Sequence, residues 1–217
     1  MDSYSKGYID ALVDAQSHID GYFFLEESLS LALLDAMQKV CPITPNQDGA
    51  ETPAYVYSHY FLGRRATALA RIDLLNKLSQ NFDVTVYTHA DCKDILPTAI
   101  YGGKIDYYDT MPTVFQHSKI NLNITLKTIQ IGIPLRAWDI LGCGGFLLTN
   151  FQQELCDFFI PGEDFVYYES PTDAIEKAAY FLSHDRERQE IAHNAFEKIA
   201  ASHTFHHRVQ SMFEIIT

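Results

Sequence analysis

The sequence predicts an α/β protein with a Rossmann-like, doubly wound parallel sheet of about five strands, preceded by an N-terminal helical segment. Short apolar, β-branched and aromatic runs alternate with amphipathic helical segments from residue 82 onward. Such alternation is typical of a parallel sheet covered by helices on both faces. The chain has 217 residues, 47% hydrophobic and 20% charged, which suits one or two globular domains.

The first 65 residues are expected to form a helical segment. Apolar residues recur at helical spacing through the first 40 residues, and a break with two prolines, an asparagine and a glycine follows at 41–49. A second helix should run from Pro53 to Leu78, because proline suits a first helical turn. We place the domain limit after residue 65, so that residues 66–217 form the Rossmann-like domain.

Within this second domain the pattern predicts five strands and five helices. The strands are expected at 82–88, 104–108, 120–124, 145–149 and 165–168. The helices are expected at 110–118, 134–143, 151–159, 171–182 and 185–201. Ligands of such sheets bind beyond the carboxyl ends of the strands, where loops lead into helices. The loops concerned are 88–90, 108–110, 124–136 and 149–151.

Charge is distributed unevenly along the chain. The formal net charge of −12 would disfavour nucleic acid as a partner if it were spread evenly. The stretch from Thr110 to Trp138, however, contains no acidic residue but holds Lys119, Lys127 and Arg136. Because this stretch includes one of the predicted ligand-binding loops, we expect an anionic ligand there. The alternative explanation is chance combined with burial, since buried strands lack charges of both signs.

Membrane and secretory classes are not indicated. The longest apolar runs fall well short of the ~20 residues of a membrane span, and the N-terminus is acidic where a secretory signal is apolar. The four cysteines lie far apart and form no CxxC pair, which predicts free thiols in a reducing cytoplasm. They are Cys41, Cys92, Cys143 and Cys156.

The stretch 131–150 carries the most chemical information. Gly132 allows the backbone to approach a ligand closely, and Pro134 favours a helix start whose free amides attract phosphate. Arg136 lies in the first turn and can contact phosphate oxygens through two nitrogens. Asp139, one turn later, can accept hydrogen bonds from two vicinal hydroxyls, such as those of a ribose. The alternative is an Arg136–Asp139 ion pair on a surface helix.

Residues 136–150 (RAWDILGCGGFLLTN) and the region after them resemble the C-terminal domain of GT-B glycosyltransferases, "glycosyl transferases group 1", of the type found in spore-maturation proteins. The resemblance continues through PGED at 161–164, DRERQEIA at 185–192 and HTF at 203–205, and covers roughly 66–212. It implies a Rossmann-like half that binds a nucleotide-sugar donor, with Asp139 on the ribose and neighbouring glycine-rich turns on the diphosphate. It implies no cofactor other than this substrate and no metal.

Further candidates surround this segment. Lys127, expected to be an exposed lysine, should offset the charge of the diphosphate, and Thr125 in the same loop is a further substrate-binding candidate. Tyr107 and Tyr108 alternate in direction on the predicted strand 104–108, so one could stack on a base while the other packs inward. His89 could contact the donor sugar, although a solvated loop histidine is the alternative.

The sequence departs from the family pattern at two points. Many retaining members have two glutamates eight residues apart; the second position falls on Asp139 and the first on Ile131, which cannot ion-pair. GT-B enzymes also have an acceptor-binding domain, which residues 1–65 are too short to supply. We therefore expect that domain elsewhere in the full-length protein or in a partner chain, and little transfer by this chain alone.

Two functions stay open from the sequence. The first is the donor half of a glycosyltransferase that transfers a sugar from a nucleotide diphosphate sugar to an unknown acceptor. The second is a non-catalytic module that binds a nucleotide or nucleotide sugar. A receiver domain is disfavoured because the predicted strand 120–124 is not followed by acids, and a dinucleotide oxidoreductase because no GxGxxG is present.

Overall fold

The structure is a computed structural model that describes residues 1–44, 49 and 51–216. It consists of two compact units, the first formed by Met1–Leu75 with Thr125–Gln130 and the second by Asn76–Ile124 with Ile131–Thr217. The boundary falls inside the helix Gly63–Ser79. The domain limit after residue 65 lies earlier on the same helix and stays a prediction.

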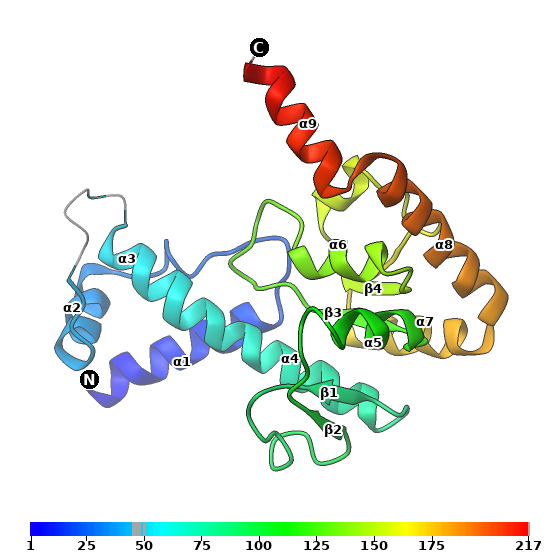
Figure 1. The fold of residues 1–217 in the computed structure, drawn as a ribbon. Helices are drawn as coiled ribbons and strands as arrows, with labels where there is room; N and C mark the ends of the chain where they lie inside the picture. Colours follow the sequence, from blue (N-terminus) through cyan, green and yellow to red (C-terminus); the bar gives the residue numbers. More distant parts are fainter. Residues whose placement is uncertain (45–48, 50, 217) are drawn as a thin grey trace. The chain divides into compact units, whose positions relative to one another are not determined.

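The first unit is helical. Its elements are α1 (Ser3–Ser17), α2 (Leu31–Val40), α3 (Pro53–Tyr55), the π-helical η1 (Val56–Leu62) and most of α4 (Gly63–Ser79). The predicted helix from Pro53 to Leu78 is confirmed as the continuous run of α3, η1 and α4 (Figure 1). The predicted break at 41–49 lies partly outside the described residues.

The expectation of helix through the first 40 residues is wrong between α1 and α2. The amide of Gln16, which is fully buried, takes the place of helical hydrogen bonds there. Its nitrogen donates to the carbonyl oxygens of Ile19 and Tyr22 at 3.2 and 2.9 Å, and its oxygen accepts from the Phe24 amide at 2.9 Å. One side chain thus satisfies three backbone groups, and the chain can turn before α2 begins.

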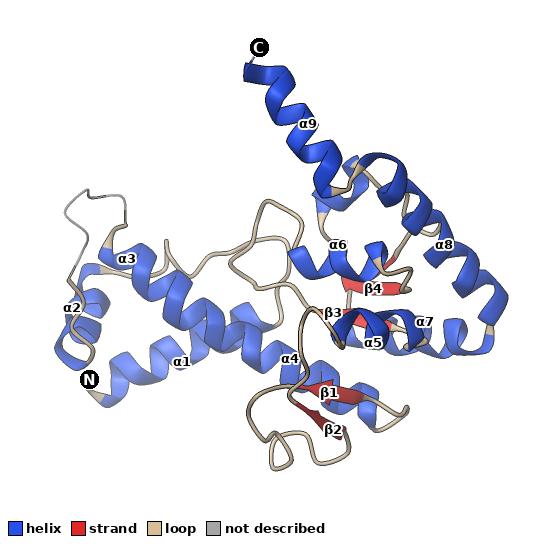
Figure 2. Cartoon of the chain, in the orientation of Figure 1, coloured by secondary structure: helices blue, strands red, loops and turns tan. Residues whose placement is uncertain are grey.

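Among its described residues, the second unit contains five parallel strands in two small sheets (Figure 2). Strands β1 (Thr85–Tyr87) and β2 (Ile100–Gly103) form one sheet, and β3 (Asn121–Asn123), β4 (Leu147–Asn150) and β5 (Val166–Tyr168) form the other in the order β3-β4-β5. The α/β class with parallel strands is therefore confirmed, and the strands divide between two hydrogen-bonded sheets.

The strand predicted at 104–108 is wrong, because the strand in this region is β2 and ends at Gly103. A turn follows, centred on Asp106. The carboxylate of Asp106 accepts hydrogen bonds from the amides of Tyr108 and Asp109, both at 2.8 Å. These amides serve the turn and not a sheet, so Tyr107 and Tyr108 do not alternate as strand residues.

The helices of this unit are α5 (Met111–His117), α6 (Leu135–Gly142), the 3₁₀-helical η2 (Gln153–Asp157), α7 (Pro171–Ser183), α8 (Asp185–Ser202) and α9 (Phe205–Ile216), of which α9 extends away from the three-stranded sheet (Figure 1). Apart from α9, each was expected from the sequence, although the segment at 151–159 holds only the short η2. All four residues of β4 are buried, and α6 contacts β3, β4 and α8 while α7 contacts β5. Both faces of the sheet are thus covered.

The glycines after α6 terminate the helix. Gly144 has φ +73°, its amide donates to the Leu141 carbonyl, and the Gly145 amide donates to the Ile140 carbonyl at 2.9 Å. This is the Schellman pattern of a helix C-terminus. A Cβ on Gly145 would lie 2.7 Å from the Phe115 carbonyl oxygen. The Gly144–Gly145 turn therefore lets α6 pass directly into β4.

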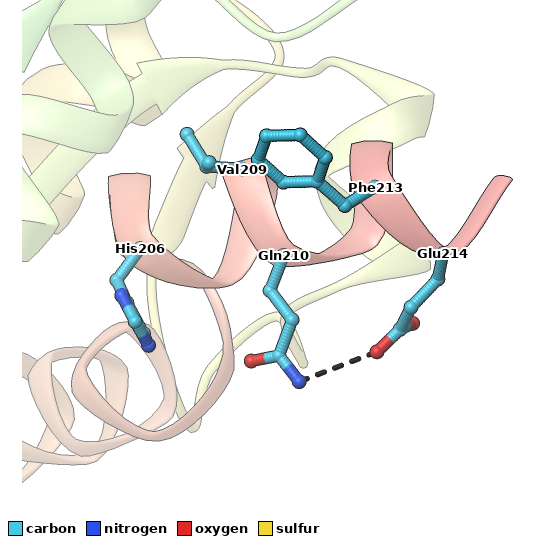
Figure 3. Close-up of a pocket in the computed structure, with 5 residues that line it drawn as sticks. All are labelled: His206, Val209, Gln210, Phe213 and Glu214. Atoms are coloured by element: carbon cyan, nitrogen blue, oxygen red, sulfur yellow. Dashed lines mark hydrogen bonds between the residues drawn. The ribbon is translucent and has the colours of Figure 1, made fainter. Parts of the chain in front are cut away.

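Helix α9 is amphipathic. In its first turn, Arg208 donates to Nδ1 of His203 at 2.8 Å and lies over the Trp138 ring. A shallow pocket on α9 is lined by residues of that helix (Figure 3). They are His206, Val209, Gln210, Phe213 and Glu214. The pocket contains none of the residues predicted to bind a nucleotide.

Candidate functional site

The N-terminus of α6 has no side-chain cap. The helix begins at Leu135, and its N-cap residue, Pro134, supplies no side-chain hydrogen bond. The first amides of a helix lack intrahelical acceptors and carry partial positive charge, which favours an anion. In the preceding loop, Gly132 has φ +107°, and a Cβ built there would meet nothing within 4 Å. The conformation of this loop, and not crowding, therefore requires glycine.

Arg136 and Asp139 have separate surroundings. Arg136 is exposed in the first turn of α6, and Asp139 is half-buried one turn later. Among the residues that the structure describes, no ion pair joins them. The hydroxyl of Tyr107 instead donates a hydrogen bond to Oδ2 of Asp139. The ion-pair explanation for this spacing is therefore not what the structure contains.

Tyr107 is the residue at this site whose role sequence reasoning missed. Its hydrogen bond to Asp139 is the largest cause that raises the pKa of Tyr107 to about 12; burial and the charge of Asp139 add to it, and Arg136 opposes it. The phenol thus stays protonated at neutral pH and serves as a hydrogen-bond donor. The aromatic pair Tyr107 and Tyr108 near a predicted ligand loop was a usable signal, but the carboxylate partner of Tyr107 could not be read from it.

Two further candidates lie in the loops after β1 and β2. The Tyr108 side chain is 85% exposed, and its ring meets the Tyr107 ring edge-on at 5.4 Å. An exposed ring of this kind is available for stacking. His89 is exposed after β1. Within the described part of the second unit, His89 makes no hydrogen bond or ring contact with α6.

Thr125 and Lys127 belong to the first unit, in which both are buried. The side chain of Lys127 is only 5% exposed, and its Nζ lies 2.7 Å from Oδ1 of Asp20. Its backbone amide donates to the hydroxyl of Thr67 at 2.9 Å. The expectation of an exposed lysine is therefore wrong: the ammonium group already has a carboxylate partner inside the first unit.

A buried polar network joins the carboxyl ends of β3 and β4. The amide nitrogen of Asn123 donates to the Thr149 hydroxyl at 3.0 Å, and that hydroxyl donates to the Asn150 carbonyl at 3.1 Å. All three residues are buried. They hold together the ends of the strands from which the ligand loops depart.

The PGED motif is a structural turn. Gly162 has φ +82°, and the side chain of Asp164, 1% exposed, accepts a hydrogen bond from the Ile160 amide at 2.6 Å and pairs with Lys198 of α8. Asn194 of α8 donates to the Glu163 carbonyl at 3.0 Å. These contacts fasten the turn before β5 to α8, so this part of the family resemblance is explained by packing.

His203 and Cys143 are both partly buried. In the described ranges, no three His, Cys, Asp or Glu side chains gather as a metal site requires. His203 packs against Trp138, Phe158 and Phe159, and this burial, followed by the charge of Arg208, lowers its pKa. Burial raises the pKa of the Cys143 thiol, which disfavours the reactive thiolate.

Comparison with known proteins bears on the family of this chain. None of the described helices is long and apolar enough to cross a membrane. No curated protein and no solved structure matches the chain. The family described as "Glycosyl transferase-like" matches residues 65–214, well over half of the sequence and nearly all of the second unit. The reaction class of such a domain is glycosyl transfer. The chain therefore belongs to the glycosyl transferase-like family, with a domain of the GT-B type at residues 65–214.

Proposed function

We propose that the second unit binds the nucleoside diphosphate of a nucleotide-sugar donor at the N-terminus of α6. In this arrangement Arg136 contacts the phosphates, Gly132 lets the loop backbone approach them, and Asp139 accepts hydrogen bonds from the ribose. The single observation that carries the proposal is the geometry of α6. Its N-terminus has no side-chain cap, an exposed arginine lies in the first turn, and a half-buried carboxylate follows one turn later.

The proposed reaction is transfer of the sugar from this donor to an acceptor bound by another domain or partner chain. As the glycosidic bond breaks, negative charge grows on the departing diphosphate. Arg136 and the amides of the α6 N-terminus would offset that charge, so we propose a mechanism without a metal. Tyr108 offers its exposed ring to the base, and His89 is the weakest candidate, for the sugar. We assign no catalytic residue.

Lys127 and Thr125 are less well supported as ligand-binding residues than Arg136 and Asp139. A phosphate would have to compete with Asp20 for the Lys127 ammonium, because the two side chains are already 2.7 Å apart. Taking a buried ammonium from its carboxylate leaves that carboxylate without its partner. The spore-maturation type and a cytoplasmic location also remain proposals; the described cysteines, all free, are compatible with the latter.

A non-catalytic module is the second candidate, and one observation favours it. Ile131 occupies the position at which many retaining members have a glutamate, and it is 82% exposed in the loop before α6. An isoleucine there can neither accept a hydrogen bond from a sugar nor carry charge. The chain would then bind the nucleotide without assisting the transfer. Measurement of transfer from a bound donor, with and without a separately supplied acceptor domain, distinguishes the two functions.

Calorimetric titration tests the binding site. The diphosphates of adenosine, guanosine, uridine and cytidine are titrated into the wild type and into single variants. Asp139→Asn keeps the shape but removes the charge, and should weaken binding by roughly 1–3 kcal/mol. Arg136→Ala should cost about as much. Added salt should weaken diphosphate binding and leave the free nucleoside nearly unaffected.

Arg186→Ala is the matched control. Arg186 is also an exposed arginine in the first turn of a helix of the second unit, α8, but it lies outside the proposed site. Its loss should leave the affinity unchanged. If Asp139→Asn binds like the wild type, the ribose assignment is wrong. If no nucleotide binds to the wild type at millimolar concentration, the donor site itself is disproved for this chain.

A further inference from the structure

The hydrogen bond between Tyr107 and Asp139 joins two separately fixed elements. Tyr107 lies in the turn after β2, where the Asp106 carboxylate accepts the amides of Tyr108 and Asp109 and the Asp106 carbonyl accepts the amide of Met111 at 2.9 Å. These three backbone contacts determine the direction from which the Tyr107 ring leaves the turn.

The other partner lies on a firmly packed helix. Ala137, Ile140 and Leu141 anchor α6 in the hydrophobic core, and the glycine turn fixes its C-terminal end. The Cα of Asp139 is thus held in place, and the main remaining freedom is rotation of its side chain. The Tyr107 hydroxyl restrains this rotation by holding Oδ2.

We infer that Tyr107 is a positioning residue that orients the Asp139 carboxylate, and that this orientation makes the site select ribonucleotides over 2′-deoxyribonucleotides. The inference rests on the proposed function, because it assumes that Asp139 contacts the sugar of a nucleotide. It adds a residue that neither the family resemblance nor the sequence pattern assigns.

The number of hydrogen bonds explains the selectivity. An ionised carboxylate offers about four acceptor positions, and the phenol occupies one of them, so enough remain for two hydroxyls. A ribose uses two acceptors whose relative placement must match its vicinal hydroxyls, whereas a 2′-deoxyribose uses one. Freeing the carboxylate to rotate therefore weakens the binding of a ribose more than that of a deoxyribose, because preorganisation is lost for two bonds at once.

The test compares ribonucleoside diphosphates with their 2′-deoxy forms by calorimetry on the full 217-residue chain. The pairs are those of adenine, guanine, uracil and cytosine. The wild type should prefer the ribose form by about tenfold, the value of one hydrogen bond to a charged group. Tyr107→Phe keeps the ring and its edge-on contact with Tyr108. It should reduce that preference to about threefold or less and change the affinity for the deoxy form by under about twofold.

Tyr180→Phe is the control. The Tyr180 hydroxyl also donates to a carboxylate, that of Glu187 at 2.9 Å, and lies on α7 outside the proposed site. Its removal should leave the ribose preference at the wild-type value. A role of Tyr107 in stability alone would weaken both nucleotides equally and leave the ratio unchanged, which would overturn the inference.

A second measurement needs no ligand. Thermal unfolding is compared for the wild type, Tyr107→Phe, Asp139→Ala, which removes the acceptor, and the double variant. If the pair exists, Tyr107→Phe lowers Tm less in the Asp139→Ala background than in the wild type. Equal decreases overturn the inference. A wild type that binds nucleotides without preferring the ribose form also overturns the inference, but it leaves the proposed diphosphate site intact. A wild type that binds none disproves both the inference and the proposed function.

Discussion

Two acidic residues of the second unit, Asp139 on α6 and Asp164 in the turn before β5, lie in the two motifs that carry the family resemblance, yet their surroundings differ. Asp164 is almost fully buried, accepts the Ile160 amide and pairs with Lys198. Asp139 is half-buried and holds a single phenol hydroxyl. The chain itself supplies two donors to Oδ2 of the buried Asp164 and one to Oδ2 of the half-buried Asp139, so more of Asp139 is accessible to a ligand.

The difference shows how to separate structural from ligand-binding residues within one family pattern. A side chain whose hydrogen-bonding capacity is satisfied by the protein contributes to stability, because its removal leaves buried partners unpaired. A side chain that is fixed in place and partly exposed, with unused acceptors, is free to bind a ligand. The glycines divide in the same way, since Gly145 is confined by atoms around it and Gly132 lies in open space.

Replacing Asp164 should have the largest effect on stability. Asp164→Ala leaves the Ile160 amide without its acceptor and Lys198 without its partner, and should lower the free energy of unfolding by about 3 kcal/mol. Asp139→Ala should lower it by less than about 1 kcal/mol, because its surroundings are partly solvated. Urea unfolding of both variants measures the difference. Equal losses would show that the contrast between the two carboxylates does not exist.

The two glycines provide the next largest effect. Gly145→Ala puts a Cβ 2.7 Å from the Phe115 carbonyl and the Asn121 amide, and should destabilise by about 3 kcal/mol. Gly132→Ala meets no atom and should cost about 1 kcal/mol through its positive φ alone. The two variants should affect nucleotide affinity the other way round. The Gly145→Ala protein that remains folded should bind as tightly as the wild type, whereas Gly132→Ala should bind weakly. Chemical unfolding measures the stability of each variant, and calorimetry on the same samples measures its nucleotide affinity.

Elements with strong periodicity could be predicted from the sequence. Helices α4, α6, α7 and α8 and strands β3, β4 and β5 lie close to their expected positions, because apolar spacing reports which face is buried. The errors occur where one polar side chain redirects the backbone. Gln16 ends α1 early, and Asp106 turns the chain where aromatic and β-branched residues suggested a strand.

The candidate site shows the same limit. Arg136 in the first turn of α6 and Asp139 one turn later follow from local spacing, and the structure has them there. The partners of Asp139 and Lys127 do not follow from spacing. Tyr107 is 32 positions from Asp139 and Asp20 is 107 positions from Lys127, so only the tertiary fold brings each pair together. A charge pattern shows where the cationic side chains are, but it does not show which of them already pair with a carboxylate of the protein.

The same contrast between a side chain paired within the protein and one left available to a ligand applies to the cations Lys127 and Arg136, and here we expect a smaller change in stability. Lys127→Met replaces a buried ammonium with an apolar side chain of similar length. Asp20 is 44% exposed at its side chain, so water can solvate it. The free energy of unfolding should then change by less than about 1 kcal/mol in either direction.

The affinity of Lys127→Met for a nucleoside diphosphate should change little. Arg136→Lys should weaken that affinity several-fold, because an ammonium cannot form the bidentate contact. A large loss of affinity in Lys127→Met would instead place this lysine at the phosphates.

The smallest expected effect is the dependence of the Tyr107–Asp139 contact on pH. The pKa of Tyr107 is raised to about 12 in the folded protein, above its ordinary value of 10.0. A raised pKa stabilises the fold fully below pH 10, and this contribution is lost as pH rises from about 10 to 12. Because Tyr107 is 43% exposed as a residue, the contribution should be under about 1 kcal/mol. The stability difference between the wild type and Tyr107→Phe should accordingly be constant from pH 7 to 9 and shrink by pH 11. Urea unfolding at each pH measures it, and a difference that grows with pH would contradict a hydrogen bond donated by the phenol to Asp139.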